Sequence, residues 1–387
     1  MALVSRGGRL SDTESARYAR HIALPGFGGD AQRRLRNARV LVIGAGGLGS
    51  PAITYLAAAG VGHLSIIDDD VVEESNLQRQ VIHRQQDLGR PKATSARDAV
   101  LRLDPSASAT ALVDRLDADN ALELFRDHDL VVDGADNFAT RYLASDAAEL
   151  TGTPVIWGTI NGFEGQLSVF WPSHGPMLRD LYPDIPDPDS VPSCAAGGVL
   201  GSLVGIVGAT MATEAIKAIT GVGELACGRL LIVSGLTAQW RELSFSPDPH
   251  RPPVTDLSEA GAACAAVADQ ASPAPQVAPG ALADELASDN PPTVVDVRDA
   301  EEFAALPPLP QAVHIPLAEI RRRGMAAVAA KVNTNVRHLN LVFVCRTGIR
   351  SAEAVRSLSA TYDARMRSLS GGMVAWAAGP GAEADED

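Results

Sequence analysis

The stretch RVLVIGAGGLGSPAITYLAAAGVGHLSIIDDD, residues 39–70, decides the fold of this chain. Val40–Ile43 is a short aliphatic run typical of a buried parallel strand, and it leads directly into the glycine turn GAGGLG. A helix rich in small residues is expected over 51–59, and His63–Ile67 supplies a second strand that ends at Asp68. Strand, glycine turn, helix, strand and final acid, within about thirty residues, predict a nucleotide-binding βαβ unit.

Each part of this unit suits a nucleotide. Residues without a Cβ let the backbone approach a phosphate, and a helix N-terminus offers free N–H groups and a positive dipole. The carboxylate of Asp68 can hold ribose hydroxyls. The alternative is a tight turn that only packs a helix closely against a strand.

The composition is that of a soluble protein of two or three domains. Of its 387 residues, 46% are hydrophobic and 21% are charged. The net charge of −14, without a basic block, disfavours nucleic acid and anionic membrane surfaces as partners. Four scattered cysteines suit a reducing compartment, and residues 1–15 lack the apolar core of a signal peptide, so we expect a cytoplasmic location. The uncharged segment Val191–Thr213 contains Pro192 and many small residues, which favours a buried helix over a membrane span.

Strand and helix patterns alternate along the chain, which predicts an α/β fold in two domains. Ser11 and Glu14 form a capping-box pattern for a helix that we expect to reach Ile22. Residues 249–279 are rich in Pro and Ala without periodicity, and we expect a flexible linker there. Further strands are expected at 109–113, 130–133, 154–159, 165–171 (antiparallel), 229–234, 293–297 and 340–344, with a long helix at 198–219. The predicted domains are 1–248 and 280–380, followed by an acidic tail at 381–387.

Polar side chains fall at strand ends or in loops that a parallel sheet would bring to one edge. They are Asp68, Asn76, Arg79, Lys92, Asp136 and Asn137. Arginine and lysine suit a triphosphate, since cationic donors stabilise charge on phosphoryl oxygens. Asp136 is a candidate magnesium ligand, because Mg²⁺ takes one or two carboxylates. A solvated charged rim is the alternative.

These segments resemble those of the ubiquitin-activating-enzyme superfamily, in particular the ThiF/MoeB-type adenylyltransferases of molybdopterin and thiamin biosynthesis. The resemblance covers residues 10–245 and rests on Arg17–Ile22, Gly44–Gly49, Ser75–Gln80, Gly89–Lys92, Asp133–Asn137 and Phe163–Gln166. It implies a Rossmann-like domain that uses ATP and Mg²⁺ to adenylate the C-terminal Gly-Gly of a small ubiquitin-like sulfur-carrier protein. It also implies a homodimer.

The resemblance assigns roles to individual residues. Gly47 and Asp68 would hold the nucleotide, and Arg79 and Lys92 would contact its phosphates. Asp136 would serve magnesium and catalysis. The expected nucleotide site also contains Ser75, Asn76, Leu77, Gln78 and Asn137, together with Arg20, which would reach into the site of a neighbouring subunit.

Two cysteines are candidate nucleophiles. Cys194 follows a Pro/Asp-rich stretch and precedes the long helix, where a helix dipole lowers a thiol pKa. Relatives with its Val-Pro-Ser-Cys motif use this thiol as an acyl acceptor or in disulfide exchange; a buried structural cysteine is the alternative. Cys345 ends an apolar strand before a loop and a helix expected from Ser351, an arrangement whose backbone N–H groups favour a thiolate. Arg346 and Arg350 add positive charge.

The Cys345 loop resembles the active loop of rhodanese sulfurtransferases. Asp296–Arg298, His314–Pro316 and Leu369–Trp376 match other rhodanese motifs. The resemblance implies a small α/β rhodanese domain and a persulfide on Cys345. Its donor would be thiosulfate or a cysteine desulfurase.

Three departures from the first family qualify these roles. The family's zinc-binding cysteine pairs are missing, because Pro176–Arg179 stands where one pair would lie and no pair follows Phe245, so we expect no zinc. Gly162 stands where an arginine is usual, and Ser234-Gly235 where Tyr-Asp is common.

Taken together, these patterns and resemblances predict an enzyme that adenylates a sulfur carrier. The enzyme would then form a thiocarboxylate with sulfur from Cys345, with Cys194 as a covalent relay. One alternative is adenylation only, with the rhodanese domain serving another acceptor. Another is a scaffold whose nucleotide site is inactive.

Overall fold

The computed structural model describes residues 2–186, 198–271, 274–305, 307–332, 340–359, 362 and 365–378. The chain divides into two compact units, unit 1 (Met1–Val267) and unit 2 (Ala268–Asp387), and each is described by itself.

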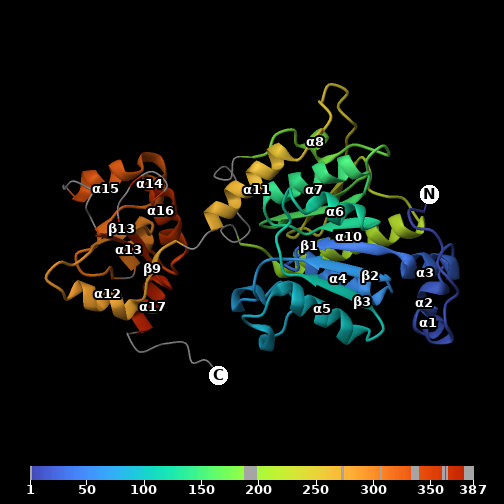
Figure 1. Cartoon of the computed structure of the whole chain (residues 1–387), viewed down its shortest axis with the longest axis horizontal. Helices are drawn as coiled ribbons and strands as arrows, with labels where there is room; N and C mark the ends of the chain where they lie inside the picture. Colours follow the sequence, from blue (N-terminus) through green and yellow to red (C-terminus); the bar gives the residue numbers. More distant parts are fainter. Residues whose placement is uncertain are drawn as a thin grey trace. The chain divides into compact units, whose positions relative to one another are not determined.

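Unit 1 is built on an eight-stranded sheet in the order β3-β2-β1-β4-β5-β6-β7-β8. Its strands β1, β2 and β3 are labelled in Figure 1. The first five strands are parallel, and β6, β7 and β8 continue the sheet in antiparallel pairs. The strands are β1 Arg39–Ile43, β2 His63–Ile67, β3 Ser108–Leu112, β4 Leu130–Asp133, β5 Val155–Asn161, β6 Glu164–Phe170, β7 Arg229–Ser234 and β8 Trp240–Ser244. Because the chain leaves β1 toward β2 and later returns to pair β4 on its other side, β1 marks the topological switch point where open α/β sheets bind ligands.

Helices cover both faces of this sheet because alternate strand residues are apolar on both sides. Val40 and Val42 belong to one buried cluster, and Leu41 and Ile43 belong to the other. The first cluster contains α3 Gly28–Asn37, α4 Gly49–Ala58, α5 Lys92–Leu103 and α10 Gly201–Thr220. The second contains α6 Ala121–Arg126, α7 Phe138–Thr151, α8 Leu178–Leu181 and α11 Ser258–Ala271. Two short 3₁₀ turns, η1 Glu74–Asn76 and η2 Gln85–Asp87, follow β2.

The N-terminal helix is shorter than expected. The capping box of Ser11 and Glu14 is present, but α1 ends at Arg17 and a second helix, α2, spans Ala19–Ile22. The break falls at Tyr18, which is buried and donates a hydrogen bond to the carboxylate of Asp104. A tertiary contact therefore interrupts a segment whose local pattern favours one helix.

Helix α10 meets the length and composition of a membrane span, but 61% of its apolar window is buried inside the unit. Leu203, Val207 and Met211 are among its core residues. This burial accounts for its lack of charge, in line with the expected core helix.

The expected flexible linker contains regular structure. Helix α11 lies within it, and Leu257, Ala260 and Cys264 are buried in the second cluster of unit 1. Alanine favours helix, and these few apolar positions suffice to anchor it. Strand β8 was also missed, because all five of its residues are exposed and no apolar alternation marks it.

Unit 2 is a smaller α/β unit with a five-stranded parallel sheet in the order β11-β10-β12-β13-β9. Its strands are β9 Gln276–Val277, β10 Thr293–Asp296, β11 Val313–His314, β12 Asn340–Val344 and β13 Arg365–Leu369. Its helices are α12 Pro279–Leu286, α13 Ala300–Ala305, α14 Leu317–Arg323, α15 Met325–Val332, α16 Ile349–Ser359 and α17 Gly372–Ala378. Buried Val342 and Phe343 of β12 belong to two apolar clusters, so this strand is the centre of the unit.

Candidate functional sites in the two units

The glycine turn between β1 and α4 has no room for side chains. Gly44 adopts a left-handed φ of 83°. A Cβ on Gly49 would lie 1.9 Å from the carbonyl oxygen of Gly44, and one on Gly47 would lie 2.8 Å from Cγ1 of Val204. The turn therefore exposes backbone at the start of α4, as phosphate binding requires.

Asp68 lies directly beside this turn. One carboxylate oxygen accepts a hydrogen bond from the N–H of Ala45 at 2.7 Å, and the other accepts one from Asp70 at 2.9 Å. Burial raises the pKa of Asp68 to about 6. These bonds fix the carboxylate at the end of β2, where its remaining lone pairs can accept hydroxyl groups.

The polar loop after β2 lies against the same turn. Arg79 donates to the carbonyl oxygen of Ser75 at 3.0 Å, and the side-chain carbons of Arg79 approach Gly47. A Cβ on Gly201, the first residue of α10, would lie 2.5 Å from the carbonyl oxygen of Gln78. Tertiary packing thus brings the glycine turn, the Ser75–Gln80 loop and the start of α10 together.

Lys92 is buried at the start of α5, and its ammonium group pairs with the exposed carboxylate of Asp70 at 2.8 Å. Asn76 is also buried, and its side chain accepts from the N–H of Glu73. The ammonium group of Lys92 is therefore held by a carboxylate that solvent or a ligand can reach. Asn76 is held by a hydrogen bond within its own turn.

The turn after β4 carries Asp136 and Asn137. A Cβ on Gly134 would lie 3.1 Å from the backbone N of Gly49, so this turn adjoins the glycine turn. Asp136 is exposed. The side chain of Asn137 accepts from the N–H of Thr140 and caps α7, so in this conformation Asn137 stabilises the helix.

A magnesium ion fits this edge only together with a substrate. In the described part of the chain, no cluster of three or more His, Cys, Asp or Glu side chains could hold a metal. Mg²⁺ is commonly held by one or two carboxylates and substrate phosphates, a requirement that an exposed Asp136 can meet.

Two residues that the sequence did not single out support this turn. Asp133, the last residue of β4, is fully buried and accepts from the N–H of Ala135 at 3.0 Å. Arg141 of α7 is buried and donates to the carbonyl oxygen of Ala135 at 2.9 Å. The backbone N–H and the carbonyl oxygen of Ala135 are thus both hydrogen-bonded to buried side chains, next to Asp136. An acid at the end of an apolar strand and an arginine in the first turn of an alanine-rich helix were the available signals.

Arg20 is exposed on α2, and within the described residues its side chain has no hydrogen bond or ion pair. Cys194 lies outside the described residues. Cys227 is half-buried and Cys264 is buried, and neither forms a disulfide among the described residues.

Cys345 directly follows the last residue of β12 in unit 2 and is fully buried. Its Sγ accepts from the N–H of Gly348 at 3.1 Å and from the hydroxyl of Ser351 at 3.5 Å. A Cβ on Gly372 would lie 2.5 Å from the carbonyl oxygen of Cys345. The helix begins at Ile349, two residues earlier than expected, so its first turn lies closer to the sulfur. These donors stabilise a thiolate or a persulfide anion.

The charge at this loop differs from the expectation that both arginines add positive charge. Arg350 pairs with Glu302 at 2.6 Å and with Asp299 at 3.2 Å. Arg346 is exposed, and no ion pair involves it in the described ranges. Only one of the two guanidinium groups is therefore uncompensated.

Two other rhodanese-like motifs make buried or partly buried contacts elsewhere in unit 2. Arg298 and Asp296 form a buried ion pair at 2.7 Å. The imidazole of His314 contacts the carbonyl oxygen of Arg298 at 2.7 Å and stacks on Phe303. In this structure, His314 therefore holds the backbone at Arg298.

The two segments that lack zinc-binding cysteines are joined by ion pairs. Asp180 of α8 binds Arg251 at 2.8 Å, and Arg251 also binds Glu149 at 3.0 Å. Arg179 forms a two-point ion pair with Asp146 at 2.8 Å. Two other positions depart from the family's usual residues. Gly162 has a left-handed φ of 57°, and the N–H of Gly235 donates to the carbonyl oxygen of Phe163 at 2.7 Å. Both residues therefore act through their backbone conformation or hydrogen bonding.

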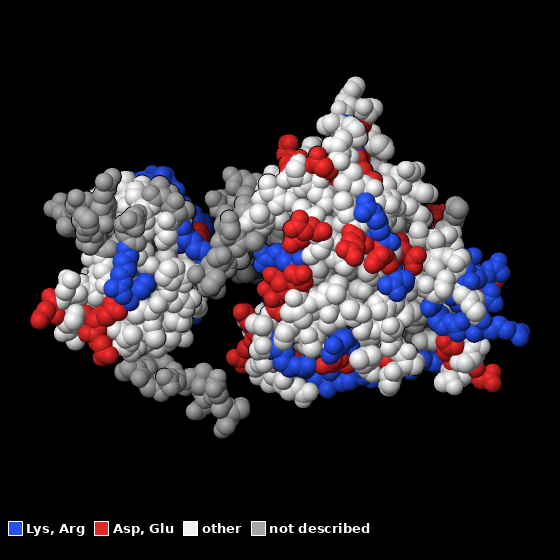
Figure 2. All heavy atoms as spheres, viewed as in Figure 1, with Lys and Arg blue, Asp and Glu red and all other residues white. Residues whose placement is uncertain are grey.

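Charge on the surface of unit 1 is mixed. On the face in Figure 2, basic side chains gather over the α1–α3 region, where α3 carries several arginines. Arg33 pairs with Asp30, and Arg36 pairs with Glu14. This arrangement offers little uncompensated positive charge to a nucleic acid.

Comparison with known proteins agrees with this geometry. The ThiF family model matches residues 18–253, and the model of the rhodanese-like domain matches residues 278–379. The chain belongs to the ThiF family and carries a rhodanese-like domain.

Two named relatives match almost the whole of this chain. The probable adenylyltransferase/sulfurtransferase MoeZ of Mycobacterium tuberculosis is 46% identical over 97% of this chain and 96% of its own length. The adenylyltransferase and sulfurtransferase MOCS3 of Drosophila ananassae is 37% identical over 95% of this chain and 84% of its own length. The chain is accordingly an adenylyltransferase and sulfurtransferase.

Solved structures share the fold of unit 1. The crystal structure of PaaA has a TM-score of 0.51 and 25% identity, covering 62% of this chain and 76% of PaaA. That of Escherichia coli MccB with ATP has a TM-score of 0.54 and 18% identity, covering 63% of this chain and 74% of MccB, which shows the fold alone.

Proposed function

We propose that unit 1 transfers AMP from ATP to the C-terminal Gly-Gly carboxylate of a ubiquitin-like sulfur carrier, and that a Cys345 persulfide then converts this carboxylate into a thiocarboxylate. The observation that carries the proposal is that one chain has both a tightly packed glycine turn beside Asp68 and a thiol that accepts hydrogen bonds from the Gly348 N–H and the Ser351 hydroxyl.

The first step needs positioning and charge stabilisation more than a base. A carboxylate is a poor electrophile, and attack of its oxygen on the α-phosphorus of ATP releases pyrophosphate and gives a mixed anhydride. The backbone of the glycine turn and the Asp68 carboxylate would hold the nucleotide, and Arg79 and Lys92 would contact its phosphates. For Lys92 this requires exchange of its exposed partner Asp70 for a phosphate. Asp136 would hold Mg²⁺, which supplies charge neutralisation when bound.

The second step exchanges the leaving group. The terminal sulfur of the Cys345 persulfide attacks the acyl carbon, and AMP leaves. Cys194 is the proposed relay thiol. Its thiolate attacks Sγ of Cys345 in the resulting acyl disulfide, the thiocarboxylate leaves, and a Cys194–Cys345 disulfide forms, which an external dithiol must reduce before the next turnover. The Gly348 N–H and the Ser351 hydroxyl, which contact Sγ of Cys345, would stabilise the persulfide before the attack.

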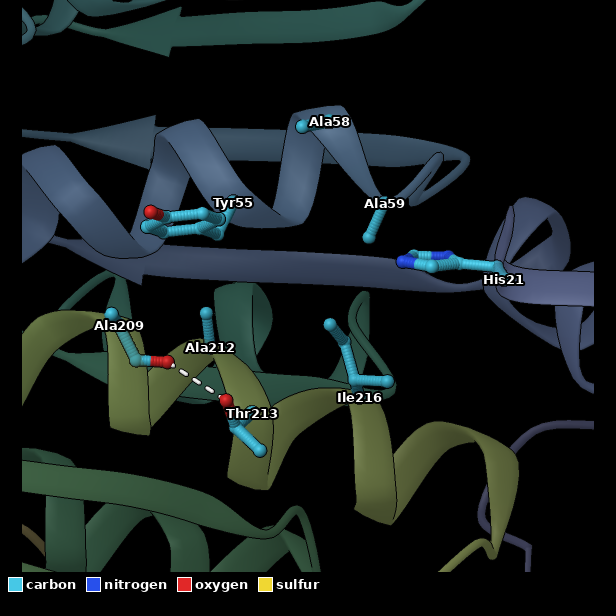
Figure 3. Close-up of a pocket in the computed structure, with 8 residues that line it drawn as sticks. All are labelled: His21, Tyr55, Ala58, Ala59, Ala209, Ala212, Thr213 and Ile216. Atoms are coloured by element: carbon cyan, nitrogen blue, oxygen red, sulfur yellow. Dashed lines mark hydrogen bonds between the residues drawn. The ribbon is translucent and has the colours of Figure 1, made fainter. Parts of the chain in front are cut away.

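The proposal includes a cytoplasmic homodimer. A hollow of about 210 Å³ lies between α2, α4 and α10, with Tyr55 and Ile216 on opposite sides and His21 at one end (Figure 3). Tyr55 is 57% exposed, and Ile206, which continues the same face of α10, is 46% exposed. A second subunit that covers this apolar face would meet Arg20, the neighbour of His21.

The test uses intact-mass spectrometry of a carrier ending in Gly-Gly. With ATP, magnesium and a sulfur donor, we expect one oxygen of the carrier to be replaced by sulfur. Cys345→Ala should abolish this gain yet keep ATP–pyrophosphate exchange, because the two reactions use different units. Cys227→Ala, a change at another unpaired thiol, is the control and should keep both.

Other outcomes separate the alternatives. Exchange without sulfur transfer, even in a single turnover with a preformed Cys345 persulfide, would support adenylation only. Absence of exchange with an active carrier would contradict the proposal and support a scaffold.

A further inference from the structure

A buried histidine contacts the glycine turn of unit 1. His83 follows the Ser75–Gln80 loop and is 5% exposed. Its Nε2 lies 3.0 Å from the carbonyl oxygen of Ala45 in the turn, and its Nδ1 lies 2.9 Å from the hydroxyl of Ser95 on α5. Since a carbonyl oxygen can only accept, Nε2 carries a proton and donates it, and the Ser95 hydroxyl can donate to Nδ1 of a neutral ring. Burial lowers the pKa of His83, which favours this neutral form.

Both polar groups of the Ala45 backbone are therefore held by side chains. Its N–H donates to the carboxylate of Asp68 at 2.7 Å, and its carbonyl oxygen accepts from His83. The hydroxyl of Ser50 approaches the same oxygen at 3.4 Å, so the imidazole makes the shorter contact. Ala45 is fully buried, where a carbonyl group that loses its donor is costly. His83 thus stabilises one orientation of this carbonyl.

The orientation of the Ala45 carbonyl decides where the next N–H points. In a trans peptide the carbonyl and the following N–H point in opposite directions, so the N–H of Gly46 is turned away from His83. Among the described residues this N–H has no acceptor, and Gly46 is partly exposed. The N–H of Gly46 is therefore a donor that a phosphate oxygen can use.

His83 also links the turn to the helix that carries Lys92. Ser95 lies three residues after Lys92 in α5, so the contact between His83 and Ser95 fixes the start of this helix relative to the turn. One side chain thus joins two groups that the proposed function assigns to the same ATP, the backbone of the turn and the Lys92 ammonium. A displacement of about 1 Å between such groups can cost a large part of the rate.

We infer that His83 is a positioning residue of the nucleotide site, which orients the Gly46 N–H and the Lys92 helix toward the phosphates of one ATP without itself touching the nucleotide. This inference rests on the proposed function, since it concerns the same ATP. It requires a hydrogen-bond donor at the place of Nε2. Loss of that donor should weaken the binding of ATP and leave the binding of the carrier unchanged.

Glutamine and asparagine separate the two contacts of the ring. The side-chain nitrogen of glutamine can occupy the place of Nε2, whereas that of asparagine reaches only the place of Nδ1. ATP–pyrophosphate exchange by the full chain, with a carrier ending in Gly-Gly, gives a KM for each substrate. His83→Asn should raise the KM for ATP about five- to twentyfold, as expected for one hydrogen bond lost at a buried group, and His83→Gln less than about threefold. The KM for the carrier should change less than about twofold in both.

A second histidine of unit 1 provides the matched control. His128 is 8% exposed, and its ring also contacts a backbone carbonyl, that of Leu124 at 2.6 Å, and a serine hydroxyl, that of Ser65 at 2.7 Å. It precedes β4, at the edge of the sheet opposite to the glycine turn. His128→Asn should therefore lower the urea midpoint of unit 1 as His83→Asn does, yet keep the wild-type KM for ATP.

Ser95→Ala keeps the histidine and removes only its second contact, so this variant carries the test if the variants of His83 do not fold. Its KM for ATP should rise about two- to fivefold. A wild-type KM for ATP in Ser95→Ala and in the folded variants of His83 would overturn the inference alone. So would an equal rise in His83→Gln and His83→Asn, which would indicate that the ring only fills space. Absence of exchange by the wild type with an active carrier would overturn the proposed adenylation and the inference with it.

Discussion

Asp133 and Arg141 place two charged groups inside the apolar second cluster of unit 1. Burial raises the pKa of Asp133 to about 6, and its second carboxylate oxygen has no hydrogen-bond partner. Burying a charge is costly, and an apolar pair would be cheaper. The arrangement is explained by the Ala135 peptide, which both side chains hold and which positions the turn that bears Asp136.

This buried carboxyl should give the protein a defined pH dependence. Its pKa rises from 3.8 to about 6 on folding, so between these pH values the folded state binds more protons than the unfolded state. Stability should therefore fall as the pH rises through this window. In Asp133→Asn this contribution is absent, and its stability relative to wild type should increase by on the order of 2 kcal/mol from pH 4 to pH 7. Urea unfolding of unit 1, followed by tryptophan fluorescence, measures this difference, and parallel curves for both proteins would contradict it.

Among the elements of unit 1, α7, α8 and the segment after β8 are held together by ion pairs. Asp180 has 2% of its side chain exposed and Arg251 has 16%, so their bond is largely shielded from water. Asp180 also accepts from the N–H of Asp248. Guanidinium and carboxylate groups thus join the two segments in which the family's zinc-binding cysteines are missing.

Loss of Arg251 should destabilise unit 1 markedly. Arg251→Met leaves the carboxylates of Asp180 and Glu149 without a cation, which typically costs on the order of 3 kcal/mol. Arg241→Met removes an exposed pair with Glu164 and should cost less than about 1 kcal/mol. Both values come from urea unfolding at neutral pH. Zinc chelation should not shift the wild-type transition, and a large shift would show that a metal, rather than these ion pairs, joins the segments.

At the scale of the whole molecule, a second subunit would explain the exposed apolar face that α4 and α10 form beside α2. Tyr55, Ile206 and Ile216 lie along it, and the small side chains of α10 between them leave the hollow in Figure 3. Contact with another apolar surface would remove this area from water.

A charge on this face should prevent the proposed dimer. Ile206→Glu should shift the mass measured by light scattering from dimer toward monomer, because a carboxylate would be buried without a partner. Leu236→Glu, at an apolar residue 73% exposed between β7 and β8, is the control and should remain dimeric. If both variants keep the wild-type mass, this face is not the interface; a monomeric wild type would contradict the dimer itself.

The sequence predicted the elements of the nucleotide unit well, because local signals there agree with tertiary packing. Strands β2 and β4 have the expected bounds, and β1 begins one residue earlier than expected, at Arg39. Prediction was weakest where the local sequence pattern and the tertiary packing favour different structures. Tyr18 interrupts a segment whose pattern predicts one helix, and α11 forms in a segment without apolar periodicity. The exposed strand β8 has no apolar alternation that could have predicted it. In each case distant residues decide the outcome.

The same division applies to the sites. The positions of Gly47, Asp68, Arg79 and Asp136 along the chain were sufficient to bring them to one sheet edge, because parallel strands end at the same side. The support of Asp136 through Asp133 and Arg141 was not visible in sequence, since it depends on α7 folding back over β4.

By itself, the sequence determined the class of this protein and the chemistry available to it: its glycine turn needs positions without a Cβ, and its Cys345 loop supplies N–H donors wherever a strand meets a helix in this way. Only the tertiary structure decided the charge at those sites. The sequence suggests that Arg350 is a free cation, but Glu302 of α13 and Asp299, which precedes that helix, place two carboxylates against it. Electrostatic energy depends on distances in space, which residue order does not contain.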